Sequence, residues 1–390
     1  MATYSTVLGQ FCDNHCDWEK VLSGYPFYLK IKRKDGFVIF NYDQLESDFN
    51  QEIVREARGI IFKENEWEVP VCHAFDKFGN YGEEYVPDMD WSSIKVSEKI
   101  DGSIMKLWCY NGKWHVSTNA NIDAEDAAVP DIRKDNFKEL FWDGVCKNLT
   151  KVGWPGGIIG WLHDLNPSYT YIFEMVSPYT RVVIPYEHTD VYFLGSRHNE
   201  LNIQYSCSKN SAYAMKTQMF PRPRLYDFHT LEDIVKASQA LPWDEEGYVC
   251  YDKYFNRCKI KSPKYVMAHF SRNNNVITRW HLINVILKGE MNEFLIYASD
   301  YKEQIEFVKG LMDNFTACVD YAGKLARSLR SLDRPQAAEV IKHFDAIAQP
   351  IMFFNYNKDM SGEDYVNGWD AYKWDRILTQ YEKFKKRYGE

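Results

Sequence analysis

The segment SEKIDGS at residues 97–103 decides the fold, because it joins two stretches that both have the character of β-strands. Lys99 stands where the first stretch ends, and Gly102 permits a tight turn into the second. Such a turn would point the Lys99 amine into a cleft beneath a sheet. The Lys-x-Asp-Gly pattern is a weak signal alone, because such tetrapeptides arise by chance and usually form exposed hairpins. Its weight depends on the segments that accompany it.

Hairpin signals on both sides of this segment predict a protein rich in antiparallel sheet. The strongest is Asn111-Gly112, which separates strand-like residues 103–110 and 114–118. Asp35-Gly36 joins residues 27–33 to 37–42 in the same way. A further pair is expected across residues 64–66, from 59–63 to 67–72. Shorter strands are expected at residues 170–176, 182–184, 191–194, 248–251 and 258–260.

Helices interrupt these strands at residues 136–151 and 231–238, where apolar residues recur at helical spacing. After Lys261 the pattern becomes almost entirely helical, from residue 265 to residue 388. We therefore predict an α+β protein in two domains. Residues 1–262 would form a domain of antiparallel sheets with helices, and residues 263–390 an all-α C-terminal domain.

Composition narrows the class of protein. The 390 residues carry a net charge of -8, which argues against a surface coated with basic residues but not against a basic cleft. Nine cysteines without regular spacing indicate reduced thiols in a cytosol-like compartment. The pair Cys12 and Cys16 lacks the second pair that a zinc site needs. The N-terminal residues do not resemble a signal peptide, and no apolar run predicts a membrane span.

Four further segments accompany residues 97–103 along the chain. They are EARGIIF at 56–62, FDKFGN at 75–80, IFEMVSP at 172–178, and EEGYV at 245–249 followed by KIKS at 259–262. Any one of them could be accidental, but the set in this order rarely is.

Together the five segments resemble the covalent nucleotidyltransferase superfamily of DNA ligases, RNA ligases and mRNA capping enzymes, and within it the phage RNA ligase 1 family. The resemblance covers roughly half of the chain and implies a nucleotidyltransferase (ATP-grasp-like ligase) domain. It also implies an ATP-dependent RNA ligase that joins 5′-phosphate and 3′-hydroxyl RNA ends through lysyl-AMP and RNA-adenylate. RNA repair would be its role, with cleaved tRNA as one candidate substrate.

The resemblance assigns Lys99 as the nucleophile that attacks the α-phosphorus of ATP. A lysine amine is protonated at neutral pH, and nearby cations favour its neutral, reactive form. Lys259 and Lys261 alternate along an expected strand, so both would face the triphosphate. Without the accompanying segments, an exposed strand face would be the better interpretation of these two lysines. Gly102 is expected to lie against the nucleotide.

The remaining assignments concern the nucleotide and a metal ion. Arg58 and Lys77 resemble nucleotide contacts, with surface ion pairs as the alternative. Glu174 would contact the ribose or a metal-bound water. Glu246 resembles the family's metal-site carboxylate, and one or two carboxylates with phosphate oxygens suffice for Mg²⁺ or Mn²⁺. Glu245 is the neighbour that could be confused with it.

The chain also departs from the family pattern. Asn119 stands where the family often has a basic residue, so one cleft cation is either missing or supplied elsewhere. Gly79 replaces a common aromatic residue, and Phe40 falls near a tyrosine that contacts the nucleotide. Asp101 is expected either to stabilise the turn or to act in catalysis. Tyr265 is a candidate contact or, as we prefer, a core residue.

Three alternatives stay open. A nick-sealing polynucleotide ligase would prefer a nicked duplex, and a guanylyltransferase would use GTP. A catalytically silent RNA-binding relative is the third, although the retained lysines and glutamates argue against it. DNA ligases and capping enzymes usually continue into a β-rich domain, which the helical residues 265–390 do not resemble. A monomer in the cytoplasm is expected, which is the host cytoplasm if a phage encodes it.

Overall fold

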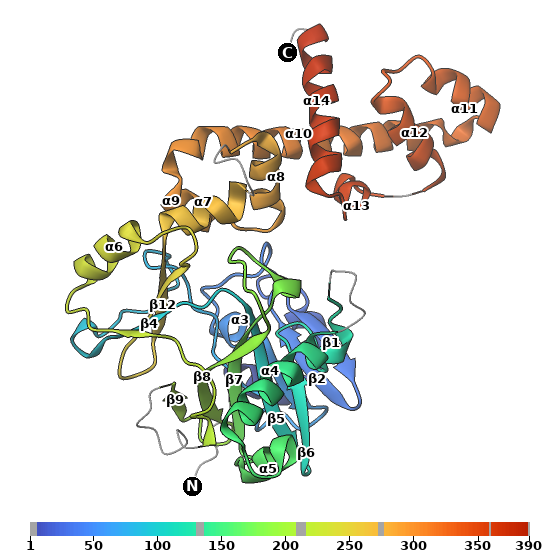
Figure 1. Cartoon of the computed structure of the whole chain (residues 1–390). Coiled ribbons are helices and arrows are strands. Elements are labelled where there is room, and N and C mark those ends of the chain that lie inside the picture. The colour runs from blue at the N-terminus through green and yellow to red at the C-terminus, as the bar shows by residue number, and fades with distance from the viewer. Residues whose placement is uncertain (1–5, 130–135, 208–215, 272–276, 359, 389–390) are drawn as a thin grey trace. The chain divides into compact units, whose positions relative to one another are not determined.

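The computed structural model describes residues 6–129, 136–207, 216–271, 277–358 and 360–388. The chain divides into two compact units, residues 1–269 and 270–390, coloured blue to yellow and orange to red in Figure 1. Among the described residues, no helix combines the length and the hydropathy needed to cross a membrane. The domain boundary between residues 262 and 263 stays a prediction.

The first sheet of unit 1 has three antiparallel strands in the order β1 (Lys30–Lys34), β2 (Phe37–Asn41) and β3 (Arg58–Lys63). Asp35 and Gly36 both have positive φ, as a two-residue hairpin turn requires. The apolar residues of β2 alternate between two clusters on opposite faces of the sheet. One cluster includes side chains of helices α1 (Val7–Asn14), α2 (Trp18–Leu22) and α3 (Glu52–Glu56).

A β-bulge interrupts the pairing of β2 with β3. Phe40 pairs with Ile60 and Asn41 pairs with Arg58, so Gly59 is an extra residue on β3. Its φ of 74° lies in the left-handed region that glycine adopts readily. Bulges of this kind redirect neighbouring side chains and often occur beside functional sites.

The second sheet has five antiparallel strands in the order β6 (Lys113–Ser117), β5 (Ser103–Tyr110), β7 (Tyr169–Val176), β8 (Asp190–His198) and β9 (Gln204–Ser206). The expected turn at Asn111-Gly112 joins β5 to β6, again with positive φ at both residues. Helices α4 (Phe137–Val152) and α5 (Gly157–Asp164) contribute to the large apolar cluster on one face (Figure 1). β7 is buried along its whole length because helices and strands surround it.

The third sheet follows the order β10 (Leu225–Tyr226), β4 (Lys95–Glu98), β11 (Gly247–Tyr251) and β12 (Arg257–Lys261). Helix α6 (Leu231–Ala240) packs on it through Ile234. Strand β4 belongs to this sheet and β5 to the five-stranded sheet, so residues 99–102 connect two sheets. This connection places the lysine segment at the junction of the sheets.

Unit 2 is built from helices, and α7 (Pro263–Ser271) spans the point where it begins. Its longest helix, α10 (Lys302–Ser328), buries the predicted stripe of Ile305, Val308, Leu311 and Met312. Among the helices of this unit, α8, α12, α13 and α14 contact α10. The helices are α8 (Arg279–Leu287), α9 (Met291–Tyr297), α10, α11 (Arg334–Ile341), α12 (Ala348–Asn357), α13 (Gly362–Val366) and α14 (Ala371–Tyr388).

The predicted α+β class, with antiparallel sheets followed by helices, is confirmed, but two predicted strands are wrong. Within residues 67–72 only Cys72 forms an isolated bridge, to Ile61 of β3, and there is no continuous strand. Residues 182–184 are not a strand either, because the backbone N–H groups of Val183 and Ile184 donate to the Asp101 carboxylate. A side chain distant in sequence thus replaces the ladder that the apolar run predicted.

Candidate active site

A pocket in unit 1 is lined by residues from all three sheets. Strand β4 and the segment that follows it contribute Lys99, β3 contributes Arg58, and β7 contributes Glu174. Six of the eight predicted site residues line this pocket: Arg58, Lys77, Lys99, Glu174, Lys259 and Lys261. The other two adjoin it, since Glu246 contacts Lys99 and Gly102 follows Lys99 in the connection between sheets.

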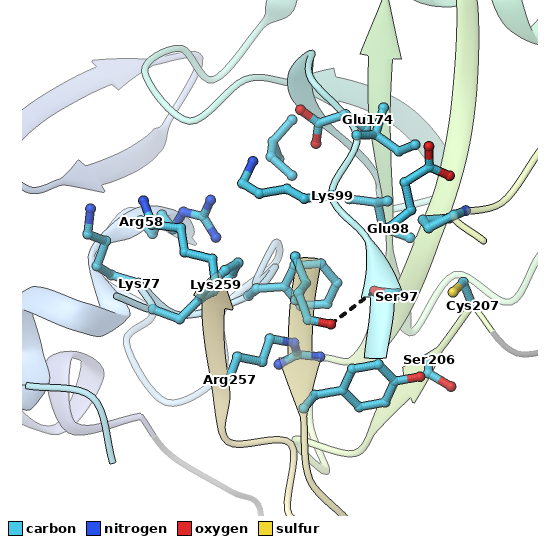
Figure 2. A pocket seen from close by; sticks show the side chains of 18 of the residues that line it. Arg58, Lys77, Ser97, Glu98, Lys99, Glu174, Ser206, Cys207, Arg257 and Lys259 are labelled. Carbon is cyan, nitrogen blue, oxygen red and sulfur yellow. Dashed lines mark hydrogen bonds between the residues drawn. The ribbon is translucent and has the colours of Figure 1, made fainter. Parts of the chain in front are cut away.

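Lys99 extends into the pocket from the end of β4 (Figure 2). Its backbone N–H donates to the carbonyl of Gly247 at 2.8 Å, which continues the pairing of β4 with β11. Its Nζ lies 2.8 Å from Oε1 of Glu246. The side chain keeps 22% of its surface exposed, so the amine is both fixed and accessible from the pocket.

Glu246 is a buried carboxylate that contacts two lysines. Besides Lys99, its Oε1 lies 3.3 Å from Nζ of Lys261. Burial opposes ionisation of Glu246, but the ammonium groups of Lys99 and Lys261 outweigh burial and hold its pKa below the usual value. Glu246 is therefore an anion at neutral pH, enclosed by positive charge.

Glu174 has the opposite character. It lies in the buried strand β7, and burial raises its pKa to about 8, although the nearby ammonium of Lys99 opposes the rise. The negative charge of Glu246 adds to the increase. Two carboxyl groups near Lys99 thus differ in their readiness to ionise, as is common at functional sites.

Gly102 allows the lysine segment to approach β7 closely. A Cβ atom at this position would lie 2.4 Å from the carbonyl oxygen of Met175 and 3.0 Å from Cγ of Glu174. No side chain can be accommodated there without movement of the β7 backbone. The structure places this glycine as a close-packing residue beside Glu174.

Asp101 stabilises the turn by three hydrogen bonds. Oδ2 accepts from the backbone N–H groups of Val183 and Ile184, at 2.9 and 2.7 Å, and Oδ1 accepts from the hydroxyl of Tyr265 at 2.8 Å. Both Asp101 and Tyr265 are buried. Of the two expectations for Asp101, the geometry favours turn stabilisation, and Tyr265 is a core residue as preferred.

The wall opposite Lys99 carries positive charge. Figure 2 shows the side chains of Arg58, Lys77 and Lys259 gathered on this side. The guanidinium of Arg58 lies 5.1 Å from the ring centre of Phe78. Lys77 Nζ lies 5.0 Å from the ring of Tyr42, so aromatic rings help to orient both cations. Such a wall suits a polyphosphate.

Tyr42 corrects the expectation about Phe40. Phe40 is fully buried in the core of the first sheet, whereas Tyr42, two residues later, lines the pocket. A tyrosine hydroxyl is therefore available at the site after all. The period of two along a strand places residues 40 and 42 on the same side, and Tyr42 packs against the apolar cluster that contains Phe40 while also lining the pocket.

A buried network fixes the segment that carries Lys77. Asp76 Oδ1 accepts from Nη1 of Arg197 at 3.0 Å and lies 2.8 Å from Nε2 of His73. Arg197 also donates to the carbonyl of Ala74 at 2.8 Å. Because Asp76 immediately precedes Lys77, this network determines where the Lys77 side chain leaves the backbone.

Acidification is expected to destabilise unit 1 through His73. Burial lowers its pKa from 6.5 to about 4, and the charge of Arg197 contributes to the decrease. The unfolded chain therefore binds this proton first, and stability present above pH 6.5 is lost as pH falls toward 4. We expect His73 to account for a loss of about 3 kcal/mol.

Urea unfolding at several pH values would measure this loss. His73→Asn, which cannot titrate, should show a smaller loss of unfolding free energy than the native chain between pH 6.5 and 4. Equal losses in both proteins would show that another group is responsible.

Two residues that the sequence reasoning missed are Arg257 and Lys106. Arg257 lines the pocket, with its guanidinium 4.2 Å from the ring centre of Phe75 and a hydrogen bond to Gln204. Lys106 is fully buried beneath the site in β5. One signal was visible for Lys106, since a lysine among the apolar residues of a strand needs a partner.

The carboxylates near Lys99 could bind a divalent cation, but they do not form a complete set of protein ligands around one. The described residues contain no group of three or more candidate ligands from His, Cys, Asp and Glu. The oxygens of Asp101 already accept three hydrogen bonds, which leaves Glu246 and Glu174 near Lys99. Mg²⁺ is commonly held by one or two carboxylates with water and substrate phosphates, so these two residues fit it.

Comparison with known proteins decides the family. The model of the family described as RNA ligase, of the phage T4 RNA ligase 1 type, matches residues 56–265, more than half of the chain. This chain belongs to the RNA ligase family. The match begins two residues before Arg58 and ends at Tyr265, so it contains every predicted site residue.

Curated relatives of this RNA ligase family member come from different sources. An RNA ligase of Rhodothermus phage RM378 is 26% identical over 330 residues, covering 69% of this chain and 71% of the phage protein. A protein of Autographa californica nuclear polyhedrosis virus, described as a bifunctional polynucleotide kinase/RNA ligase, is 29% identical over 304 residues. That match covers 74% of this chain but only 42% of the viral protein.

Solved structures of similar proteins are more distant. An archaeal ATP-dependent RNA ligase is 13% identical, with 75% of this chain and 74% of that chain covered and a TM-score of 0.42. A Naegleria gruberi RNA ligase mutant with ATP and Mn is 16% identical, with 45% and 51% covered and a TM-score of 0.34. Similarity this weak assigns no role to any individual residue of this RNA ligase family member.

Proposed function

We propose that this protein is an ATP-dependent RNA ligase whose Lys99 becomes covalently linked to AMP. One observation carries the proposal: an accessible lysine amine, 2.8 Å from a buried carboxylate, faces a wall of cations in a chain of the RNA ligase family. The described relatives named as RNA ligases support the same reading.

The first step is adenylation of the protein. The neutral amine of Lys99 attacks the α-phosphorus of ATP, the bond from that phosphorus to the bridging oxygen breaks, and pyrophosphate leaves. The attacking nitrogen gives up its proton, and Glu246, whose Oε1 lies 2.8 Å from Nζ of Lys99, can accept it. Arg58, Lys77 and Lys259 stabilise charge on the phosphates.

Two further steps complete ligation. AMP passes from Lys99 to the 5′-phosphate of an RNA, which gives RNA-adenylate and a free lysine. A 3′-hydroxyl then attacks the 5′-phosphorus, AMP leaves, and a phosphodiester bond forms. The same cations serve all three steps because each transfers a phosphoryl group.

Glu246 and Glu174 would hold a divalent cation, Mg²⁺ or Mn²⁺. When bound, such a cation adds positive charge beside the phosphates and favours the neutral form of a nearby amine. Glu246 suits this role because it is already ionised. Glu174 would ionise more readily beside such a cation, because positive charge favours the carboxylate form.

The substrate is proposed to be RNA with single-stranded ends, in RNA repair, with cleaved tRNA as the candidate. Splayed ends reach a pocket without the unwinding of a duplex. We propose further that the protein acts as a monomer in the cytoplasm and that residues 1–262 carry the chemistry.

Labelling with nucleotides tests the proposed function. The purified protein is incubated with Mg²⁺ and either α-labelled ATP or α-labelled GTP, and the covalent product is separated on a denaturing gel. ATP is expected to label the protein, and added 5′-phosphorylated single-stranded RNA should remove the label and yield ligated RNA.

The other outcomes separate the alternatives. Labelling by GTP alone would indicate a guanylyltransferase, and discharge only on a nicked duplex would indicate a nick-sealing ligase. Absence of label from both nucleotides, in folded protein that mass spectrometry shows to be free of AMP, would leave a silent RNA-binding relative.

A further inference from the structure

The β-bulge at Gly59 presents a backbone carbonyl that accepts a hydrogen bond from a side chain of another sheet. Gly59 is the extra residue of β3, immediately after Arg58, and it is buried. Its carbonyl oxygen accepts a hydrogen bond from Nζ of Lys106. A buried carbonyl without a partner is costly, so this bond helps to maintain the bulge.

Lys106 occupies an unfavourable position for a lysine. It is completely buried in β5, between Met105 and Leu107. The ionisable groups that influence its charge are Cys72 and Arg58, and none of the described carboxylates forms an ion pair with it. Burial lowers the pKa of Lys106 to about 8, which shows that the site disfavours its charge. A lysine here is expected to reduce stability.

The ammonium group and the bulge are packed against each other. A Cβ atom on Gly59 would lie 2.5 Å from Nζ of Lys106 and 2.7 Å from Cα and the carbonyl oxygen of Asn119. Lys106 Nζ therefore lies directly against the backbone of the bulge. The conformation of β3 beside Arg58 is therefore coupled to the Lys106 side chain.

The direction of Arg58 depends on this bulge. Side chains alternate between the two faces of a strand, so the loss of one extra residue from the register would turn Arg58 to the opposite face. In the bulged form Arg58 lines the pocket, with its guanidinium over Phe78.

We propose that Lys106 is a positioning residue for the nucleotide reaction, which holds the Gly59 bulge and thereby directs Arg58 into the pocket. This inference rests on the proposed function, since it takes ATP as the molecule that Arg58 contacts. Lys106 itself does not touch the pocket, and its effect on ATP passes through Arg58.

Lys106→Met tests the proposal, because methionine fills a similar volume without charge or donor. The ATP concentration that gives half-maximal protein labelling is expected to rise by at least about tenfold, since the carbonyl of Gly59 loses its charged partner. The thermal midpoint is expected to change little, because removal of a buried charge offsets the loss of a partner for the Gly59 carbonyl. A residue with only a structural role would instead lower the midpoint.

A double-mutant cycle shows whether the effect passes through Arg58. Labelling is measured against ATP concentration for the native chain, Lys106→Met, Arg58→Ala and the double variant. The double variant is expected to show the same ATP dependence as Arg58→Ala. If Lys106 acts only through Arg58, its loss has no further effect once Arg58 is absent. Lys113→Met, an exposed lysine on the neighbouring strand β6, is the matched control and should behave as the native chain does.

Each contrary result has a distinct meaning. A native ATP dependence in Lys106→Met, multiplied effects in the double variant, or failure of Lys106→Met to fold would each overturn the role of Lys106. If the native chain is labelled in these cases, the proposed function stands. If the native chain takes no label from ATP, the proposed function fails and the role of Lys106 falls with it.

Discussion

Lys99→Ala is expected to abolish the covalent labelling of the protein by ATP, with a rate reduced by at least about 10⁴-fold. The variant removes the proposed nucleophile and leaves the cation wall intact. Labelling on a denaturing gel measures the loss directly. Lys95→Ala is the matched control, because Lys95 lies at the other end of β4 and is exposed.

The same variant offers an internal check on folding. RNA that already carries a 5′-adenylate needs no lysyl-AMP, so Lys99→Ala should still join it to a 3′-hydroxyl end. Label retained in Lys99→Ala would contradict the assignment and point to Lys261, which also lines the pocket and contacts Glu246.

Glu246→Gln is expected to slow labelling at saturating ATP by at least about 100-fold. The substitution keeps the size of the side chain but removes the anion that holds Lys99 and Lys261. It also removes the carboxylate proposed to bind the cation, so the Mg²⁺ concentration needed for labelling should rise.

Stability should fall in the same variant. Two lysine ammonium groups would lose their buried partner, at a cost of about 2 kcal/mol, which is less than for a fully buried pair because Lys99 is partly exposed. Urea unfolding measures this change. Glu245→Gln is the matched control, since Glu245 contacts the exposed Arg224 instead, and a similar loss in both variants would contradict the role of Glu246.

Local turn chemistry made much of the fold predictable. Asp35-Gly36 and Asn111-Gly112 set both hairpins, because positive φ at two adjacent residues is readily adopted by few residue types. The strand at 67–72 was overpredicted because an apolar run resembles a strand even where only an isolated bridge, between Cys72 and Ile61, forms. A run of apolar residues indicates that a segment is buried, but it does not indicate that the segment pairs with a neighbouring strand.

The site residues that could be predicted from the sequence are those that belong to short sequence motifs. The lysine segment, Glu174 and Glu246 each stand within a short motif, and the structure brings them together. Supporting residues were not predictable in this way. Asp101 bonds to backbone more than eighty residues away, and Lys106 bonds to Gly59 across two sheets. Such pairs depend on how the sheets meet, which no local pattern records.

The hydrogen bond between Tyr265 and Asp101 has a consequence for how the molecule can be shortened. Tyr265 lies in the first turns of α7, after the last lysine of β12, yet it completes the set of bonds that shapes the turn after Lys99. A shortened protein that ends at residue 262 would lose this tether, whereas one that ends at residue 269 would keep it. The helix that follows the sheets thus helps to shape the pocket that contains Lys99.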